Sequence, residues 1–398
     1  MLKNKLANMV KYNRFLLTMY RFFGSMLIGF LKLITPIKEK QILFMSFGGQ
    51  RFDASPKAIY DSLKNDPFFA DYKLIWAFVN PQEFKDCEVE SVKTDTISFY
   101  RKAISSKIWV NNSSMQRGLN LGRQGIIEFN SWHGTPLKKM GDDIHCATPS
   151  LSNKKSPVVT YYCSQSDYDR EIFSRFFKTD IENIIISDLP HNDVLLQPAD
   201  EKVKALKAKL NIPEDKKVIL YAPTYREFNR DALNCCYIKP PIDMEKWQRE
   251  LSDDYVLLFR AHYEIVNVLC VTDNEFVRDV SNYPILTDLF LISDMLISDY
   301  SSTYFDYSIL ERPLLCFAYD YEEYQTKRGL YIKLEDFMPS GSRVNLDEDS
   351  LIDEIKSMDY DKYCKATSEF KKRFAPNAGN ATNTVIDKMK ETISELGR

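Results

Sequence analysis

Short apolar runs that alternate with helical patterns constrain the fold of this chain more than any other feature. The first half contains six such runs, at 41–47, 72–79, 107–111, 125–132, 161–164 and 184–186. The second half contains four, at 217–222, 255–260, 295–298 and 313–318. Strands that alternate with helices form βαβ units, and continuous apolar runs are typical of parallel strands covered on both faces. The sequence therefore predicts an α/β protein with two Rossmann-type parallel sheets.

The interval between the two series of runs sets the predicted domain boundary. It spans 190–213 and includes a charged helix at 200–210. We expect a first domain at 38–189, a second at 190–378, and a helix at 379–398 that packs back on the first half. Two such domains face one another, and ligands of parallel sheets bind in the crevice beyond the carboxyl ends of the strands.

The segment 1–37 is strongly basic and amphipathic. Seven basic residues precede the first acidic residue, Glu39, namely Lys3, Lys5, Lys11, Arg14, Arg21, Lys32 and Lys38. At 100° per residue, five of them fall within an arc of about 80°, opposite a broad aromatic and aliphatic face. This pattern predicts a helix that lies in a membrane interface near anionic lipids and ends before Pro36.

Two alternatives for this segment stay open, a membrane-crossing anchor and an ordinary soluble helix. The longest uncharged stretch after Arg21 has ten residues, 22–31, whereas about 20 are needed to cross a bilayer. No small-residue cleavage site follows it.

The whole chain has a net charge of only -3, which argues against a nucleic-acid partner. With +7 in residues 1–38, the rest of the chain carries -10.

The segment 131–139, SWHGTPLKK, carries the first candidate catalytic group. His133 follows a predicted strand and precedes a glycine, so a tight turn would aim its imidazole into the crevice. A histidine with a pKa near 6.5 can take a proton from a hydroxyl nucleophile at neutral pH. Gly134 would let a substrate approach the backbone, and Lys138 would hold an anionic group.

Three other strand ends carry groups suited to phosphate. In Arg260-Ala261-His262, alternation places Arg260 and His262 on one side of a strand, where both can donate to a phosphate oxygen. Arg226 ends the segment 221–226 and is expected to face the same crevice. Ser301, Ser302 and Thr303 begin a predicted helix, where hydroxyls and free N–H groups would seat a pyrophosphate.

Metal and cofactor sites are not expected. The chain contains neither a GxGxxG nor a GxxxxGK[ST] segment. Its three Asp-x-Asp pairs lie in charged, helical stretches at 167–169, 347–349 and 359–361 rather than at strand ends. The one candidate zinc cluster is His145 and Cys146 with Cys163. We instead expect the eight cysteines to be reduced thiols.

Four segments together resemble the CDP-glycerol glycerophosphotransferase family, which comprises the teichoic acid primases and polymerases and related capsule enzymes. They are SWHGTPLKKMG, YAPTYR, RAH and ISDYSSTYFDYSILERPLLCFAYD, and the resemblance covers roughly residues 40–390. It implies a GT-B-like fold and a CDP-alditol donor. It also implies His133 as the base, and His262 with Ser301, Ser302 and Thr303 on the donor phosphates. Gly134, Thr135, Lys138 and Asp306 are expected on the acceptor side or in supporting positions.

One block departs from the family pattern. Family members usually carry Gly-x-Pro-Arg-Asn-Asp between the halves, where this chain has 188–193, DLPHND. The missing glycine and arginine affect the hinge or the acceptor side, and leave the donor site unchanged.

The sequence thus predicts a transferase at the cytoplasmic face of the cell membrane. It would move glycerol phosphate from CDP-glycerol to a hydroxyl of a lipid-linked acceptor in teichoic acid or capsule synthesis, releasing CMP. The alternatives are a CDP-ribitol transferase or nucleotide-sugar glycosyltransferase on the same fold, and a non-catalytic binding protein of envelope assembly.

Overall fold

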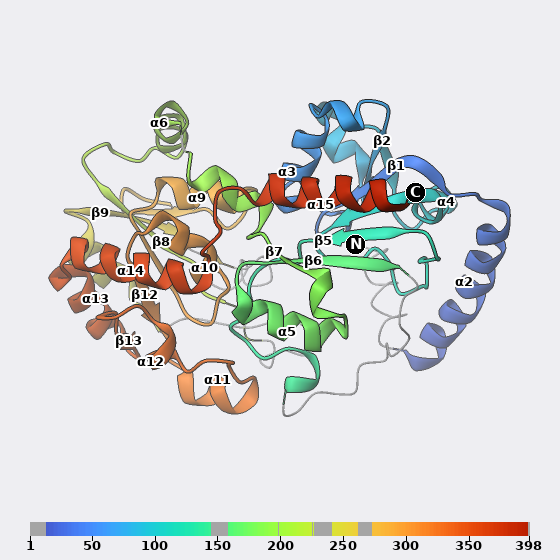
Figure 1. Ribbon diagram of the computed structural model, residues 1–398. Coiled ribbons are helices and arrows are strands. Elements are labelled where there is room, and N and C mark those ends of the chain that lie inside the picture. The colour runs from blue at the N-terminus through green and yellow to red at the C-terminus, as the bar shows by residue number, and fades with distance from the viewer. Residues whose placement is uncertain are drawn as a thin grey trace.

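The computed structural model describes residues 13–144, 158–197, 199–224, 226, 241–261 and 273–396, and it contains two sheets in which every pairing is parallel. The predicted α/β class with two parallel sheets is therefore confirmed. The two halves lie side by side, and each carries helices around its sheet (Figure 1).

The first sheet has seven strands in the order β3-β2-β1-β4-β5-β6-β7. Their bounds are β1 Lys38–Met45, β2 Lys73–Phe78, β3 Ser91–Lys93, β4 Ser106–Asn111, β5 Ile127–Asn130, β6 Val159–Ser164 and β7 Ile184–Ile186. The helices of this half are α2 Arg14–Ile34, α3 Ala54–Leu63, α4 Ile97–Ser105 and α5 Asp167–Phe177. Strand order reverses between β1 and β4, which is the place where parallel sheets open a ligand crevice.

The second sheet has six strands in the order β10-β9-β8-β11-β12-β13. Their bounds are β8 Lys217–Tyr221, β9 Tyr255–Phe259, β10 Val277–Asp279, β11 Met295–Ser298, β12 Leu314–Phe317 and β13 Val344–Asn345. The helices that follow β7 are α6 Asp200–Lys209, α7 Met244–Leu251, α9 Leu286–Ile292, α10 Thr303–Tyr307, α11 Tyr321–Lys327, α12 Leu334–Phe337, α13 Glu348–Ser357, α14 Tyr360–Phe374 and α15 Ala381–Leu396. The reversal here falls between β8 and β11.

Both faces of each sheet are covered by apolar packing. In β8, Val218 and Leu220 belong to one buried cluster, whereas Ile219 and Tyr221 belong to the cluster on the opposite face. Alternating side chains of a strand point to opposite faces, so a strand with both faces buried must be apolar throughout. This requirement explains the continuous apolar runs of the sequence.

The last helix, α15, returns to the first half, where Val385 and Met389 share a buried cluster with residues of β1 and β2. In Figure 1 it runs beside α3. Its start is capped from the linker, because the Asp193 carboxylate accepts hydrogen bonds from the backbone N–H groups of Ala381 and Thr382, at 2.9 and 2.8 Å.

Helix α2 lies at the outer edge of the first half, away from the second sheet (Figure 1). Ile28 and Leu31 are buried against this half. Its other face leaves large apolar side chains exposed, among them Phe15, Phe22, Phe23, Met26, Phe30 and Leu33. By length and composition, residues 15–34 could also cross a membrane.

One part of the expected basic face is turned inward. The Lys32 ammonium donates hydrogen bonds to the backbone carbonyls of Asn120 and Gly122, at 2.9 and 2.6 Å. The expectation that Lys32 would line an outward basic face is therefore wrong, because these carbonyls hold it against the body. The first twelve residues, with Lys3, Lys5 and Lys11, lie outside the described part of the chain.

Candidate active site

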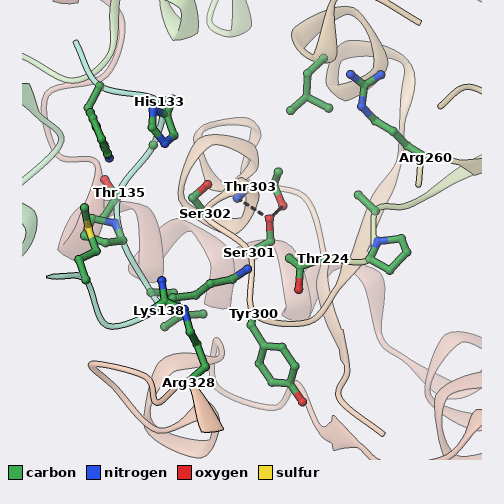
Figure 2. Close-up of a pocket in the computed structure, with 18 of the residues that line it drawn as sticks. His133, Thr135, Lys138, Thr224, Arg260, Tyr300, Ser301, Ser302, Thr303 and Arg328 are labelled. Carbon is green, nitrogen blue, oxygen red and sulfur yellow. Dashed lines mark hydrogen bonds between the residues drawn. The ribbon is translucent and has the colours of Figure 1, made fainter. Parts of the chain in front are cut away.

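A cavity of about 590 Å³ lies between the two halves, and both contribute to its wall. The first half supplies the loop after β5, from Trp132 to Lys138. The second half supplies Arg260 and the segment from Tyr300 to Thr303. Figure 2 shows His133 and Arg260 on opposite sides of the cavity, with Ser301 to Thr303 between them.

The loop after β5 crosses from the first half into the second. Leu137 is buried in the core of the second half, and its carbonyl accepts a hydrogen bond from the Tyr331 backbone N–H at 2.9 Å. Lys139 donates its backbone N–H to the Gly329 carbonyl at 3.1 Å. These contacts anchor the histidine-bearing loop to both halves, so the relative position of the halves sets the geometry of the site.

His133 lies near the start of the loop after β5, and one of its ring nitrogens is available. Its Nδ1 lies 3.1 Å from the Asn112 carbonyl oxygen, which fixes the proton on Nδ1 and leaves Nε2 as an acceptor. The preceding Trp132 has φ +52° and its ring contacts the imidazole at a tilt of 32°, with ring centroids 4.1 Å apart. The ring faces the cavity, yet the surrounding protein removes much of its water and lowers the pKa of His133. A neutral imidazole at pH 7 suits a general base.

Thr135 lines the same cavity but its hydroxyl is occupied. The oxygen lies 2.6 Å from Gln165 Oε1 and 2.9 Å from Asp169 Oδ2, all of them buried. Burial raises the pKa of Asp169 to about 6, although the backbone N–H groups of Gln165 and Ser166 oppose that shift. Thr135 therefore ties the loop to the start of α5, and Asp169 has a structural role there.

The second half presents hydroxyls to the cavity at the start of α10. Ser301 Oγ accepts hydrogen bonds from the Thr303 backbone N–H and hydroxyl, at 3.2 and 2.9 Å. The Asp299 carboxylate below them accepts from the backbone N–H groups of Thr224 and Tyr300, at 3.0 and 2.7 Å. This network fixes the turn after β11, so that Ser301, Ser302 and Thr303 all line the cavity.

Arg260 reaches the cavity as a cation without an ion pair among the described residues. Its guanidinium donates to the carbonyls of Tyr283 and Val280, at 2.8 and 3.3 Å. Burial, and secondarily the charge of Arg51, lowers the pKa of Arg260 to about 10. A half-buried cation that has no ion pair among the described residues is well suited to bind an anion. His262, the partner expected beside it, lies outside the described residues.

Arg226 does not face the crevice, and that expectation is corrected. Its side chain is 1% exposed and lies between two carboxylates, with Nη1 2.9 Å from Asp299 Oδ2 and Nε 2.5 Å from Asp320 Oδ2. The rings of Tyr300, Tyr319 and Tyr324 surround it. Burial alone would lower the pKa of Arg226, but Asp299 and Asp320 raise it above its ordinary value. In the structure, Arg226 links the segments that follow β8, β11 and β12, next to the cavity.

Asp306 lies behind the cavity rather than in its wall, and it joins the two halves. Its Oδ1 accepts a hydrogen bond from Asn192 Nδ2 at 2.9 Å, and its Oδ2 lies 3.9 Å from His191 Nε2. The other ring nitrogen of His191 lies 2.8 Å from Ser55 Oγ. The block that departs from the family pattern, 188–193, therefore supplies a link between the halves.

Two basic side chains of the cavity come from opposite halves. Lys138, expected from the sequence, reaches over the Tyr324 ring, with 5.7 Å from its Nζ to the centroid. Arg328 was missed, and its guanidinium donates to the Lys139 carbonyl. Arg328 follows a helix and not a strand, so no strand-end signal marks it in the sequence.

The described residues contain no group of three or more His, Cys, Asp and Glu side chains placed to hold a metal ion. Cys163 is a buried free thiol, whereas His145 and Cys146 lie outside the described residues. The expectation of a metal-independent site thus stays a prediction.

Comparison with known proteins gives one consistent result. The family model described as CDP-Glycerol:Poly(glycerophosphate) glycerophosphotransferase matches residues 27–391. A teichoic acid poly(glycerol phosphate) polymerase of Staphylococcus epidermidis is 35% identical over 376 residues, which are 90% of this chain and 52% of that protein. A teichoic acid glycerol-phosphate transferase of Staphylococcus aureus is 33% identical over 360 residues, 86% of this chain and 91% of that protein. The chain thus spans about half the length of the first relative and most of the second.

The fold has a solved counterpart in the wall teichoic acid polymerase TagF. Its structure aligns with a TM-score of 0.80 at 33% identity, covering 93% of this chain and 94% of that one. A variant of the same polymerase was also solved after soaking with CDPG. The match to a GT-B-like protein over nearly the whole chain confirms the expected architecture.

Proposed function

Because the chain belongs to the CDP-glycerol:poly(glycerophosphate) glycerophosphotransferase family, we propose that it transfers glycerol phosphate from CDP-glycerol to a hydroxyl of a lipid-linked acceptor in teichoic acid or capsule synthesis. One observation carries the proposal. A histidine with an available Nε2, an arginine without an ion pair among the described residues and a cluster of hydroxyls converge on one cavity from both halves.

The reaction is a displacement at the β-phosphorus of the donor. His133 Nε2 takes the proton of the attacking hydroxyl, whose oxygen forms the new bond to phosphorus while the bond to the CMP oxygen breaks. Arg260, with Ser301, Ser302 and Thr303, meets the negative charge that grows on the phosphate oxygens and on departing CMP. His262 is proposed to act with them at the position after Ala261. Gly134 and Thr135 shape the acceptor side of the cavity, and Lys138 lies at its edge.

We also propose that the protein works as a peripheral protein at the cytoplasmic face of the membrane. The outward face of α2 supports this, because Phe22, Phe30 and Leu33 are 60%, 58% and 86% exposed. Such a broad apolar face on a soluble surface marks an interaction site. In the sequence, Lys3, Lys5 and Lys11 precede this helix, and basic residues next to an apolar helix favour anionic lipid. Helix α2 lies at the outer edge of the first half (Figure 1), and none of its residues lines the cavity between the halves.

Product analysis tests the proposal. The purified full chain is incubated with CDP-glycerol and a synthetic lipid-linked disaccharide. The release of CMP is followed, and the mass of the lipid product is measured by mass spectrometry. We expect CMP and an acceptor heavier by one or more glycerol phosphate units, and a loss of both with His133→Ala. Near-normal CMP release by His133→Ala would refute the assignment of the base.

Donor competition separates the alternatives. CDP-ribitol in place of CDP-glycerol identifies a ribitol transferase, and release of UDP from UDP-sugars identifies a glycosyltransferase. Binding of CDP-glycerol without any turnover on several lipid-linked acceptors would favour the non-catalytic binding protein.

A further inference from the structure

A second cavity, of about 510 Å³, lies where α2 ends and β1 begins, on the side of the first half covered by α4. It is separate from the cavity between the two halves, and none of its lining residues belongs to that site. Its walls come from residues 34–36, from Lys38 and from one face of α4. Helices α2 and α4 pack against each other, so the cavity is a fixed feature of this edge.

Basic side chains dominate the polar lining of this cavity. Lys38, Arg101 and Lys102 line it, and no acidic residue does. Lys102 has Glu90 as a distant partner, 3.7 Å away. Within the part of the chain that the structure describes, neither Lys38 nor Arg101 forms an ion pair, and both are exposed. Three converging cations with one weak counter-charge make a site for an anion.

Hydroxyl groups complete the lining. Thr35 is 7% exposed, and its hydroxyl has no hydrogen-bond partner among the described residues. A buried hydroxyl without a partner costs stability, and an acceptor oxygen in the cavity would relieve that cost. Ser98, in the first turn of α4, also lines the cavity. Hydroxyls beside cations suit a phosphate group, which offers several acceptor oxygens.

The rim of the cavity points to a lipid as the source of the phosphate. Ile34 and Ile97 line it and are 54% and 60% exposed, and the adjacent Leu33 is 86% exposed. These side chains continue the apolar face of α2 up to the basic lining. An apolar rim around a basic cavity matches a headgroup phosphate carried at the surface of a hydrocarbon layer.

We therefore propose that this cavity binds the phosphate of an anionic membrane lipid and thereby fixes the orientation of the protein on the membrane. The inference rests on the membrane association proposed above. It adds a discrete headgroup site beside the apolar face of α2.

The test compares binding of the full-length protein to phosphatidylcholine vesicles with binding to vesicles that also contain phosphatidylglycerol. The variant Lys38→Gln/Arg101→Gln removes two cavity cations. The matched control, Lys333→Gln/Lys365→Gln, removes the same charge from exposed positions of the second half. We expect the cavity variant to bind anionic vesicles roughly five- to thirtyfold more weakly, since each basic contact near the surface contributes about fivefold. It should bind neutral vesicles as wild type does, and the control should lose less than about twofold.

Ser98→Asp provides a second variant that keeps the fold. A carboxylate in the first turn of α4 favours the helix, whereas in the cavity it repels a phosphate. We expect an unchanged or higher Tm together with weaker binding to anionic vesicles.

The outcomes separate the two proposals. Equal losses by the cavity variant and the control would overturn the headgroup site, because only overall charge would then matter. Wild-type binding to both vesicle types with the same affinity would also overturn it, while leaving membrane association intact. Absence of wild-type binding to either vesicle would overturn membrane association, and the headgroup site with it.

Discussion

Gly134 and Ser302 touch across the boundary between the two halves. A Cβ atom added to Gly134 would lie 2.7 Å from Ser302 Oγ and 2.8 Å from Ser302 Cβ. Gly134 follows the candidate base, and Ser302 belongs to the hydroxyl cluster at α10. The position next to the base therefore has no room for a side chain while the halves hold this arrangement.

Gly134→Ala should lower activity strongly. Gly134 has φ +135°, which L-residues rarely adopt, and the added methyl group collides with Ser302. We expect kcat for CMP release to fall by about 100-fold, the effect of a displacement of about 1 Å between reacting groups. The control is Gly341→Ala, which has φ +92° but nothing within 4 Å of the new Cβ. Similar losses of activity in both variants would mean that the contact with Ser302 is irrelevant.

His133 should give the pH profile an acidic limb below pH 6.5. Burial lowers the pKa of His133, so the neutral base persists to lower pH than for an ordinary histidine. The rate, measured as kcat/KM for CMP release, should fall as pH drops through that lowered pKa. His133→Gln should abolish this limb and reduce the rate by about 100- to 10,000-fold. An unchanged limb in His133→Gln would assign it to another group.

Arg226→Met should destabilise the second half. The substitution leaves the buried Asp299 carboxylate and the half-buried Asp320 carboxylate without their cation. We expect a loss of about 3–5 kcal/mol in the free energy of unfolding, measured by denaturant titration. The control is Arg249→Met, an exposed position for which the change should stay within about 0.5 kcal/mol. A stable Arg226→Met protein with a raised KM for CDP-glycerol would instead favour direct phosphate binding.

Arg260→Gln should impair donor binding and leave the stability of the protein intact, in contrast to Arg226→Met. The guanidinium has only carbonyl partners among the described residues, and burial, with the charge of Arg51, lowers the pKa of Arg260. Removing that charge should leave Tm unchanged or raise it. The KM for CDP-glycerol should rise about 10- to 100-fold, which is the loss expected for one hydrogen bond to a charged group. An unchanged KM would remove Arg260 from the donor site.

Most of the fold could be predicted because buried parallel strands must be apolar on both faces. The runs at 184–186 and 295–298 coincide with β7 and β11 residue for residue. The strands that were missed are β3, β10 and β13, each two or three residues long. They lie at sheet edges and, unlike the edge strand β7 with its three isoleucines, they contain polar or charged residues, so they give no apolar run to detect.

The candidate site was predictable to the extent that strand ends meet at one edge of a sheet. This rule brought His133, Arg260 and Ser301 toward one cavity. It could not reveal the environment of Arg226, because its partner Asp320 is 94 positions away in the chain. Nor could it reveal Arg328, which reaches the cavity from a helix end.

His191 should make the stability of the protein depend on pH. Burial lowers its pKa, but the Asp306 carboxylate, with Asp188 and Asp53, more than reverses that effect, so the pKa of His191 is raised. A raised pKa in the folded state stabilises the protein below the unfolded value near 6.5, and this stabilisation is lost as pH rises through the folded value. Wild type should therefore exceed His191→Gln in Tm by the largest margin at low pH. In the free energy of unfolding, the difference at low pH should be about 1 kcal/mol, the size expected for one ion pair with limited burial.

His133→Gln serves as the control of opposite sign. The pKa of His133 is lowered, so its neutral form is favoured by folding, and the stability it contributes is lost as pH falls. Replacing His133 should thus raise the stability of the protein at low pH, whereas replacing His191 should lower it there. Thermal unfolding of wild type and the two variants from pH 5 to pH 8.5 decides the matter. If the difference between wild type and His191→Gln does not change across that range, the contact between His191 and Asp306 is not an ion pair, and the link between the halves is a neutral hydrogen-bond network.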